Sequence, residues 1–561
     1  MISKFSLSRN QIVILATSLL LSASWVLFRV WEVRPAILGD EWVYTMSSRH
    51  RSFWDTAPDA LGNHLFNFVY KSTLLCGESF YQCGKVLNLI FFIGFILVIF
   101  FIALRYVSFW WSLTLAIATA LSPISVYVSM YLPESLYIFL LALTTLLILE
   151  AVRRDTWQAW ASVGSALALA ALTKPHALIS LLAIGLFILF YSLGRPNFLK
   201  KVSVRGFTTL GAFVLVRLSF GFLLAGPVGV NFLSNYGASD AVGDIVAGAG
   251  DTAGQLSPST TAFALFPVQF EIHVLTAVAA LGAFLAPLLV NALRMLGKKA
   301  ASEVQVFGLL ALIWFGVMLV AIVLFTGWVT GTGDDHTTRV LLRYYDFLFP
   351  ILAVAGLAVA SDFVQEKPVL WSRLGGAGIV FILASSAFTG IFGTLTIQIA
   401  DAPTLAGLVV NTQVYNVSAG LVVLVVLMVA FFPGFSKYGV ASAVTLGLVL
   451  TGFQAQGQYI NFRGQDSSAD VAGKVIASSL DAEERDAVAV VAATRFDGRV
   501  ASLWMDSDNQ LILVAPSSTI NDELLEPHIS RVLLLGDINF DGNQVLEVSG
   551  DGFQLIKLDP R

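Results

Sequence analysis

Long apolar runs recur along this chain from Gln11 to Phe453, and they constrain its fold more than any other feature. A run of about 18 or more apolar residues is long enough to cross the hydrocarbon core of a bilayer as a helix. Only 12% of the residues are charged and 57% are hydrophobic, so lipid rather than water surrounds most of the chain. The pattern predicts about thirteen spans, centred near residues 21, 95, 118, 142, 165, 184, 216, 282, 315, 352, 383, 423 and 446.

Basic residues are concentrated in alternate connections between these spans. Arg153, Arg154, Lys200, Lys298 and Lys299 all fall on the side of the N-terminus, whereas the opposite short loops carry almost no Lys or Arg. The positive-inside rule therefore predicts a multi-pass inner-membrane protein with a cytoplasmic N-terminus and an extracytoplasmic C-terminus. The formal net charge of -4 offers no basic surface for nucleic acid.

The chain divides into two expected domains. Residues 1–455 form the membrane domain, with a first outer loop at about residues 32–85 and a second outer segment at residues 226–271 that we expect to be a loop. Residues 456–561 change composition and contain short β-type runs at 487–492, 510–515 and 531–535. We predict a mainly α polytopic protein with a small extracytoplasmic α/β domain at its C-terminus.

Two adjacent acids, Asp40 and Glu41, directly follow the first predicted span and stand beside aromatic residues. A carboxylate that is partly buried at a membrane surface has a raised pKa and suits the role of general base for a sugar hydroxyl. Its neighbour would orient that hydroxyl or hold a metal. On composition alone, a solvated loop is the more frequent explanation of such a pair.

A series of short motifs recurs on the predicted outer side in a recognisable order. The acids at 40 and 41 come first, and a polar stretch with His64 and Lys71 follows before the second span. The later motifs are Tyr131-Leu132-Pro133-Glu134-Ser135, Leu172-Thr173-Lys174-Pro175 and Arg343-Tyr344-Tyr345. Over roughly residues 10 to 360 this order resembles the GT-C fold of polytopic glycosyltransferases, such as protein O-mannosyltransferases, the aminoarabinose transferase of lipid A and mycobacterial arabinofuranosyltransferases.

The resemblance implies an enzyme that transfers a sugar from a polyprenyl-phosphate donor to a glycan, lipid or protein acceptor on the extracytoplasmic face, with inversion. It implies that Asp40 is the catalytic base and Glu41 its companion. The leaving phosphate gains negative charge, so cations must surround it. The candidates for binding the donor phosphate are Lys71, which resembles the family's phosphate contact, with Lys174, Arg217, Arg339, Arg343 and Tyr344.

Several of these residues also have simpler explanations. Arg343 at a span end is equally compatible with anchoring by snorkelling. Arg217 lies in mid-span, where a charge usually faces a cavity or a partner. Glu134 suits a metal, the acceptor, a lysine partner or a helix start. His64, Asp335 and His336 are further acceptor or metal candidates, with Mg²⁺ or Mn²⁺ as the candidate cofactor, although solvated loop is the better explanation of the run at 334–336.

The two cysteines, Cys76 and Cys83, both fall in the first outer loop. An extracytoplasmic location permits a disulfide between them, but a spacing of seven residues alone leaves two free thiols as the alternative. For the whole chain, the rival functions are a secondary transporter, a lipid-linked sugar flippase and a non-catalytic assembly protein. A transporter should show internal repeats, and the sequence shows none.

Overall fold

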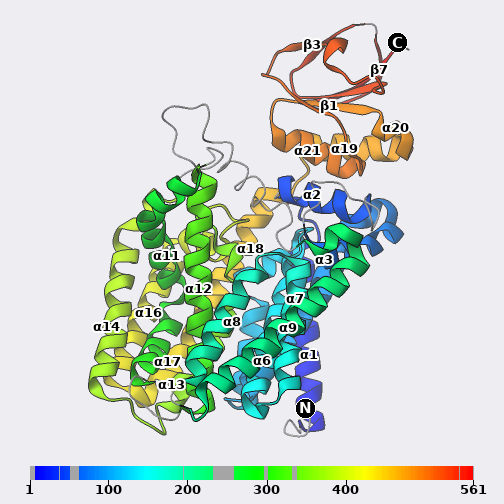
Figure 1. Cartoon of the computed structure of the whole chain (residues 1–561). Coiled ribbons are helices and arrows are strands. Elements are labelled where there is room, and N and C mark those ends of the chain that lie inside the picture. The colour runs from blue at the N-terminus through cyan, green and yellow to red at the C-terminus, as the bar shows by residue number, and fades with distance from the viewer. Residues whose placement is uncertain are drawn as a thin grey trace.

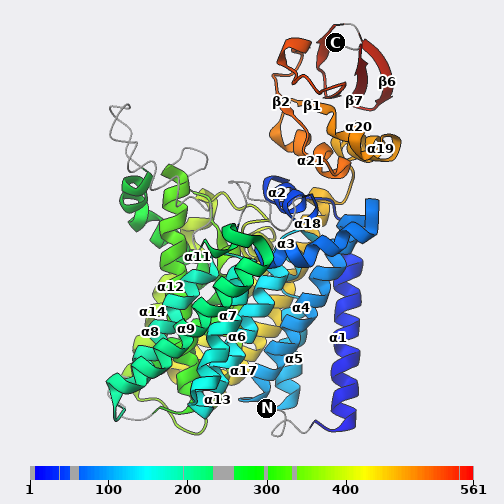
Figure 2. The ribbon, with the colours of Figure 1, turned by 45° about the vertical axis from the view of Figure 1, so that its right-hand side comes forward.

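The structure, a computed structural model of the whole chain, is described here for residues 7–36, 38–50, 62–193, 195–231, 258–295, 301–331, 338–542 and 544–559. A bundle of long helices makes up most of the molecule, and a small sheet-containing domain stands on one end of it (Figure 1). The N-terminus lies at the far end of the bundle from this domain (Figures 1 and 2).

The bundle follows the predicted order of apolar segments. Its long helices are α1 (Arg9–Val30), α4 (Phe80–Leu104), α5 (Phe109–Ala120), α6 (Glu134–Arg154), α7 (Trp157–Thr173), α8 (Ala177–Ser192), α9 (Phe198–Ala225), α11 (Pro258–Met295), α12 (Glu303–Gly331), α13 (Leu348–Asp362), α14 (Leu370–Ser386), α16 (Thr412–Phe431) and α18 (Val449–Arg463). Shorter pieces include η3 (Pro123–Ser129), η4 (Gly226–Val230), η5 (Leu342–Tyr344), η7 (Phe392–Thr394), α15 (Pro403–Val409), η8 (Pro433–Phe435), α17 (Ser436–Ser442) and η9 (Ala443–Leu448).

Every predicted span centre falls within one of these helical elements, but the count of thirteen spans is not confirmed. Among the described residues, nine helices are long and apolar enough to cross a membrane, or ten if α5 and η3 form one bent span. The helices α8 and α13 are apolar but have only 16 and 15 residues. Apolar length alone does not decide whether such shorter helices are full crossings.

The first outer segment folds into short helices on the upper end of the bundle: α2 (Leu38–Arg49), α3 (His64–Tyr70) and η2 (Lys71–Ser79). A disulfide joins Cys76 of η2 to Cys83 in α4, so the alternative of two free thiols is wrong. The expectation of a loop over residues 226–271 is also wrong in part, since α11 already begins at Pro258. Proline is well tolerated in the first turn of a helix, and the apolar residues that follow it extend α11.

The buried Lys85 side chain fixes the point at which α1 ends. Its ammonium group donates to the carbonyl oxygens of Val30, Trp31 and Val33 at 3.0, 2.7 and 2.7 Å. The last carbonyls of a helix have no partner within it, and a lysine can satisfy them. The chain therefore leaves α1 along a fixed path toward the first turn of α2.

The C-terminal domain is an α/β unit that begins after α18. Its central sheet has the strand order β2-β1-β4-β7-β6, in which β1 pairs in parallel with β2 and β4, and β7 pairs antiparallel with β4 and β6. All three β-type runs noted in the sequence are strands. The elements are α19 (Ser468–Ser479), α20 (Ala482–Asp486), β1 (Val488–Ala492), α21 (Arg495–Met505), β2 (Leu511–Leu513), β3 (Thr519–Asn521), η10 (Asp522–Leu524), β4 (Arg531–Leu535), β5 (Asn539–Asp541), β6 (Gln544–Gly550) and β7 (Phe553–Leu558).

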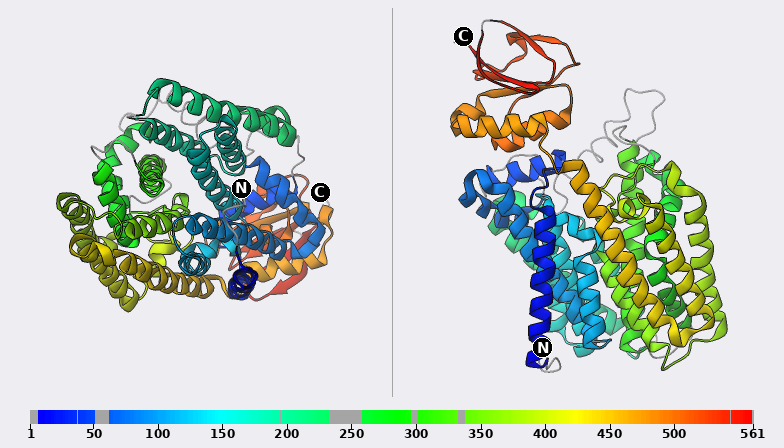
Figure 3. Two further views of the ribbon diagram at one scale, coloured as in Figure 1. Left: turned by 90° about the horizontal axis from the view of Figure 1, so that it is seen from below. Right: turned by 180° about the vertical axis from the view of Figure 1, so that it is seen from behind.

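The helices α19 and α21 lie between the sheet and the bundle, and α18 leads up to them (Figure 3). Ion pairs fasten this layer to the first outer segment. Asp506, which follows α21, accepts hydrogen bonds from Arg49 Nε at 2.8 Å and from His50 at 2.9 Å. Arg34 binds Asp466 at 2.7 Å. The C-terminal domain is thus docked on α2 and on the chain that leads to it.

We predict that Asp506→Asn lowers stability at neutral pH and removes part of its acid sensitivity. Burial alone would raise the pKa of Asp506, but the hydrogen bonds from Arg49 and His50 outweigh it and lower the pKa to about 2. A lowered carboxyl pKa stabilises the fold above the unfolded pKa, and this stability is lost as the pH falls through the folded value. From the ordinary value of 3.8, the contribution is about 2 kcal/mol.

The measurement is the melting temperature of the full-length protein in detergent between pH 7 and pH 2.5. The wild type should melt higher at pH 7, and the difference should shrink between about pH 4 and pH 2. Some acid sensitivity should persist in the variant because Arg34 and Lys474 likewise lower the pKa of Asp466 to about 2. Equal melting temperatures at pH 7 would contradict a stabilising role for Asp506.

Candidate active site

An ion pair between Asp40 and Arg343 joins the first outer segment to the chain that precedes α13. Arg343 Nη2 lies 2.7 Å from Asp40 Oδ2, across 303 residues of sequence. The carboxylate is in the first turn of α2 and its side chain is 43% exposed, whereas the Arg343 side chain is 9% exposed. An accessible acid is therefore held against a nearly buried cation at the upper end of the bundle.

Asp401 organises the two predicted arginines of this region. It lies just before α15 and is 2% exposed. Its carboxylate is 2.6 Å from Arg339 Nη2 and 3.4 Å from Arg343 Nε, and its carbonyl oxygen accepts from the Arg343 backbone N–H. Two carboxylates thus face two guanidinium groups, so the cluster is close to neutral without a ligand.

A second buried ion pair lies beside this cluster. Lys174, which follows α7, lies 2.6 Å from Glu134 at the start of α6, and both side chains are less than 5% exposed. The Lys174 ammonium is also 4.9 Å from the centroid of the Tyr344 ring, which stacks on His176 at 4.6 Å. Of the explanations open for Glu134, two are observed: it pairs with a lysine, and it is the first residue of α6.

Several buried polar atoms around these ion pairs have no hydrogen-bond partner among the described residues. They include Arg343 Nη1, Glu134 Oε2, Tyr137 Oη and Asp346 Oδ1. An unsatisfied buried polar group costs about 1–3 kcal/mol. Such a concentration of unsatisfied donors and acceptors is typical of a place that receives water or a polar ligand.

Glu41 is fully buried and serves as an anchor within the protein. Its carboxylate accepts hydrogen bonds from the backbone N–H groups of Ala36 and Tyr131 at 2.7 and 2.8 Å, and from the Tyr81 hydroxyl at 2.7 Å. These bonds tie the first turn of α2 to α4 and to the segment before α6. Glu41 thus orients Asp40 through the backbone, while its side chain points into the protein.

The remaining predicted site residues lie at different distances from this cluster. His64 is buried, and the preceding Asn63 donates to the Thr173 carbonyl at 2.7 Å, beside Lys174. Arg217 is buried and donates to the carbonyls of Gly229 and Asn231, so it holds η4 against α9. Lys71 is the first residue of η2, above α4. Phosphate binding by Arg217 and Lys71 stays a prediction, and Asp335 and His336 lie outside the described residues.

Sequence reasoning missed Asp401 and Asp346. Asp401 is an isolated acid on the predicted outer side between two spans. This position could have suggested that it pairs with Arg339 and Arg343, which were predicted on the same side. Asp346 follows the Arg-Tyr-Tyr motif and accepts a hydrogen bond from the Tyr127 hydroxyl at 2.6 Å. Nothing in the sequence indicates that Tyr127 would face it.

The suggested divalent metal stays a prediction, because two of its candidate ligands, Asp335 and His336, lie outside the described residues. Within them, no group of three or more His, Cys, Asp or Glu side chains comes close enough to hold a metal ion. The carboxylates of Asp40 and Asp401 face arginines, and those of Glu41 accept hydrogen bonds. No step below is therefore routed through a metal.

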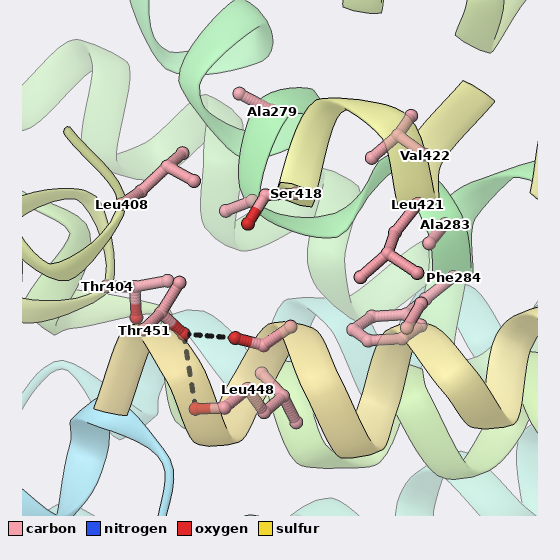
Figure 4. Close-up of a pocket in the computed structure, with 13 residues that line it drawn as sticks. Ala279, Ala283, Phe284, Thr404, Leu408, Ser418, Leu421, Val422, Leu448 and Thr451 are labelled. Carbon is pink, nitrogen blue, oxygen red and sulfur yellow. Dashed lines mark hydrogen bonds between the residues drawn. The ribbon is translucent and has the colours of Figure 1, made fainter. Parts of the chain in front are cut away.

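A small cavity between α11, α15, α16, η9 and α18 is not this site (Figure 4). Its volume is about 30 Å³, and its lining is mainly apolar, with the hydroxyls of Thr404, Ser418 and Thr451 as its polar groups. The Thr451 hydroxyl donates to carbonyls of its own helical turn. A space of this size holds about one water molecule, which is far too little for a sugar.

Comparison with known proteins places this geometry in context. The sequence model of the dolichyl-phosphate-mannose-protein mannosyltransferase family matches residues 72–220. No curated protein matches the chain in sequence.

Solved structures extend the likeness to nearly the whole chain. The oligosaccharyltransferase AglB of Archaeoglobus fulgidus, in complex with an inhibitory peptide and a dolichol-phosphate, is 13% identical, with a TM-score of 0.51 over 94% of this chain and 70% of AglB. ArnT of Cupriavidus metallidurans, bound to undecaprenyl phosphate, is 12% identical, with a TM-score of 0.50 over 98% of both chains. This chain is therefore a polytopic membrane protein with the GT-C fold of membrane glycosyltransferases.

Proposed function

We propose that this protein is a membrane glycosyltransferase that transfers a sugar from a polyprenyl-phosphate donor to a glycan, lipid or protein acceptor. The observation that carries the proposal is the ion pair between Asp40 and Arg343. It brings a proton acceptor and a phosphate-binding cation into contact at the end of the bundle where the C-terminal domain stands. Because such a donor has a lipid tail, its phosphate lies near this level of the membrane.

The chemistry assigns a separate role to each partner of the pair. Asp40 removes the proton from the acceptor hydroxyl as the acceptor oxygen attacks the anomeric carbon of the donor. The bond between that carbon and the phosphate oxygen breaks, and its electron pair stays on the departing polyprenyl phosphate. Arg343 stabilises the negative charge that develops there, with Lys174 and Tyr344 beside it. Inversion at the anomeric carbon follows from this direct displacement.

The ion pair also suggests how donor binding prepares the base. Without a ligand, the Asp40 carboxylate is engaged by Arg343 Nη2 at 2.7 Å. Arg343 Nη1 has no hydrogen-bond partner among the described residues, so it can bind a phosphate oxygen. A bound phosphate competes with Asp40 for the same guanidinium and so frees the carboxylate to accept a hydrogen bond from the acceptor hydroxyl.

We further propose that the site faces the extracytoplasmic side of the inner membrane, with the N-terminus in the cytoplasm. The distribution of basic residues supports this orientation. The sugar is either a hexose or a pentose. The C-terminal domain, on the same side as Asp40 (Figure 1), would then cover or flank the acceptor.

Substitution of Asp40 by Asn tests the proposed base. The amide cannot accept the proton, so we expect sugar transfer to fall by about 10²- to 10⁴-fold. Cells that lack the protein should accumulate one polyprenyl-linked sugar, and mass spectrometry of their lipid extract should show that the wild type clears it whereas Asp40→Asn does not.

The matched control is Asp362→Asn at the end of α13. Asp362 is also paired with an arginine, Arg294 at 3.0 Å, but it lies at the opposite end of the bundle. This control should clear the lipid as the wild type does. Normal clearance by a well-expressed Asp40→Asn protein would remove Asp40 as the base. The absence of any accumulated lipid-linked sugar would instead favour a non-catalytic assembly protein.

Replacement of Arg343 by Gln tests the phosphate contact without knowledge of the sugar. One lost charge-assisted hydrogen bond is worth about 1.5–3 kcal/mol, so we expect the purified protein to bind undecaprenyl phosphate about 10- to 100-fold more weakly. Arg294→Gln is the matched control, because Arg294 also pairs with a carboxylate, that of Asp362, but at the opposite end of the bundle. Equal losses in both variants would argue for a general charge effect and against a specific contact by Arg343.

A flippase or transporter is the second candidate, and the same variants separate it from an enzyme. A flippase moves the intact lipid-linked sugar, so its substrate would also accumulate in deletion cells. Membranes isolated from wild-type cells, however, would form no glycosylated product. Formation of a glycosylated product by wild-type membranes, with release of the free polyprenyl phosphate, supports the transferase.

A further inference from the structure

The helix α2 is held at both of its ends by buried or partly buried ion pairs. Its first turn carries Asp40, which binds Arg343, and its last residue is Arg49, which binds Asp506. The Arg49 side chain is only 3% exposed and lies over the ring of Phe80 at 4.4 Å. A helix of twelve residues is about 18 Å long and moves as a rod. The position of one end therefore constrains the other.

A continuous series of buried hydrogen bonds connects these two ends. Arg49 Nη1 donates to the Thr73 hydroxyl at 3.3 Å, and that hydroxyl is 2.9 Å from the hydroxyl of Tyr131. The backbone N–H of Tyr131 donates to Glu41 at 2.8 Å. The pair formed by Arg49 and Asp506 is thus linked to the residue next to Asp40.

Aromatic contacts from the C-terminal domain reinforce the same helix. The Arg499 guanidinium of α21 lies 3.6 Å from the ring centroid of Trp42, two residues after Asp40. Trp504 of α21 lies 5.6 Å from Tyr81, the hydroxyl donor to Glu41. The domain therefore contacts Trp42 of α2 and also Tyr81, whose hydroxyl bonds to Glu41 in the first turn of α2.

From these contacts we propose that the C-terminal domain positions the catalytic base, with Asp506 as the principal positioning residue. The proposal rests on the proposed function, because it requires Asp40 to be the base. Asp506 touches neither donor nor acceptor in this account. It acts by holding Arg49, and with it α2, so that the Asp40 carboxylate reaches the acceptor hydroxyl. Small displacements of a catalytic group are enough to slow transfer strongly.

The test compares Asp506→Asn with Glu547→Gln in the full-length protein. Glu547 on β6 also binds an arginine, Arg531 at 2.9 Å, but β6 lies on the side of the domain away from α2 (Figure 2). The donor is the lipid-linked sugar extracted from deletion cells. We expect Asp506→Asn to lower kcat by about 10-fold or more, with unchanged affinity for undecaprenyl phosphate. Hydrogen exchange should be faster in peptides that cover residues 38–49, and Glu547→Gln should match the wild type.

A double variant separates positioning from a general loss of folding. If Asp506 acts through Asp40, adding Asp506→Asn to Asp40→Asn should cause no further loss of transfer. A full additional loss, or an equal loss of kcat in Glu547→Gln, overturns the proposal. If Asp506→Asn is not recovered as a monodisperse protein, Arg499→Gln serves instead. Arg499 is partly exposed, and its loss should lower kcat less strongly while it again leaves carrier binding unchanged.

The outcomes also distinguish this inference from the proposed function. Normal transfer by Asp40→Asn overturns both, since no base would remain to be positioned. Loss of transfer in Asp40→Asn together with wild-type kcat in both Asp506→Asn and Arg499→Gln overturns only the positioning role. The C-terminal domain would then be an attached unit without influence on the reaction.

Discussion

The contact between Asp40 and Arg343 is the interaction on which the arrangement of the site depends. It joins the segment after the first helix to the segment before α13, and so it closes the bundle at its upper end. A buried guanidinium without a counter-charge would be costly there. Asp40 and Asp401 both supply this counter-charge, but the Asp40 side chain is much more exposed than that of Asp401. The buried one fixes the arginine, and the exposed one remains accessible to substrates.

Most of the architecture could be predicted from the sequence. Long apolar runs mark segments that can cross a bilayer, and the distribution of Lys and Arg predicts their orientation. Every predicted centre falls in a helical element, and the change of composition in the C-terminal part of the chain indicated the α/β domain. The count of thirteen spans is not confirmed, for a physical reason. A short apolar helix such as α13 has the hydropathy of a span but fewer residues than a straight crossing needs, so hydropathy alone does not classify it.

Only part of the candidate site could be predicted from the sequence. Order and sidedness along the chain predicted that Asp40, Lys174 and Arg343 lie on one side, and the structure brings them to the same end of the bundle. Glu41 was expected to assist the chemistry, but its burial beneath Ala36, Tyr81 and Tyr131 depends on how α2 packs, which no local pattern encodes. Asp401 lies 58 residues after Arg343 along the chain, and only the folded bundle brings the two together.

The placement of the C-terminal domain on α2 has a consequence for how the protein is made. A ribosome delivers residues 38–49 long before residues 495–506, and folding during synthesis proceeds from the N-terminus. Until the last segment emerges, Arg49 has no Asp506 to meet, and the helix that bears Asp40 lacks its final support. A chain truncated by premature termination or proteolysis would thus enter the membrane, but its Asp40 carboxylate would not be held in position. We therefore expect transfer activity only from the full-length polypeptide.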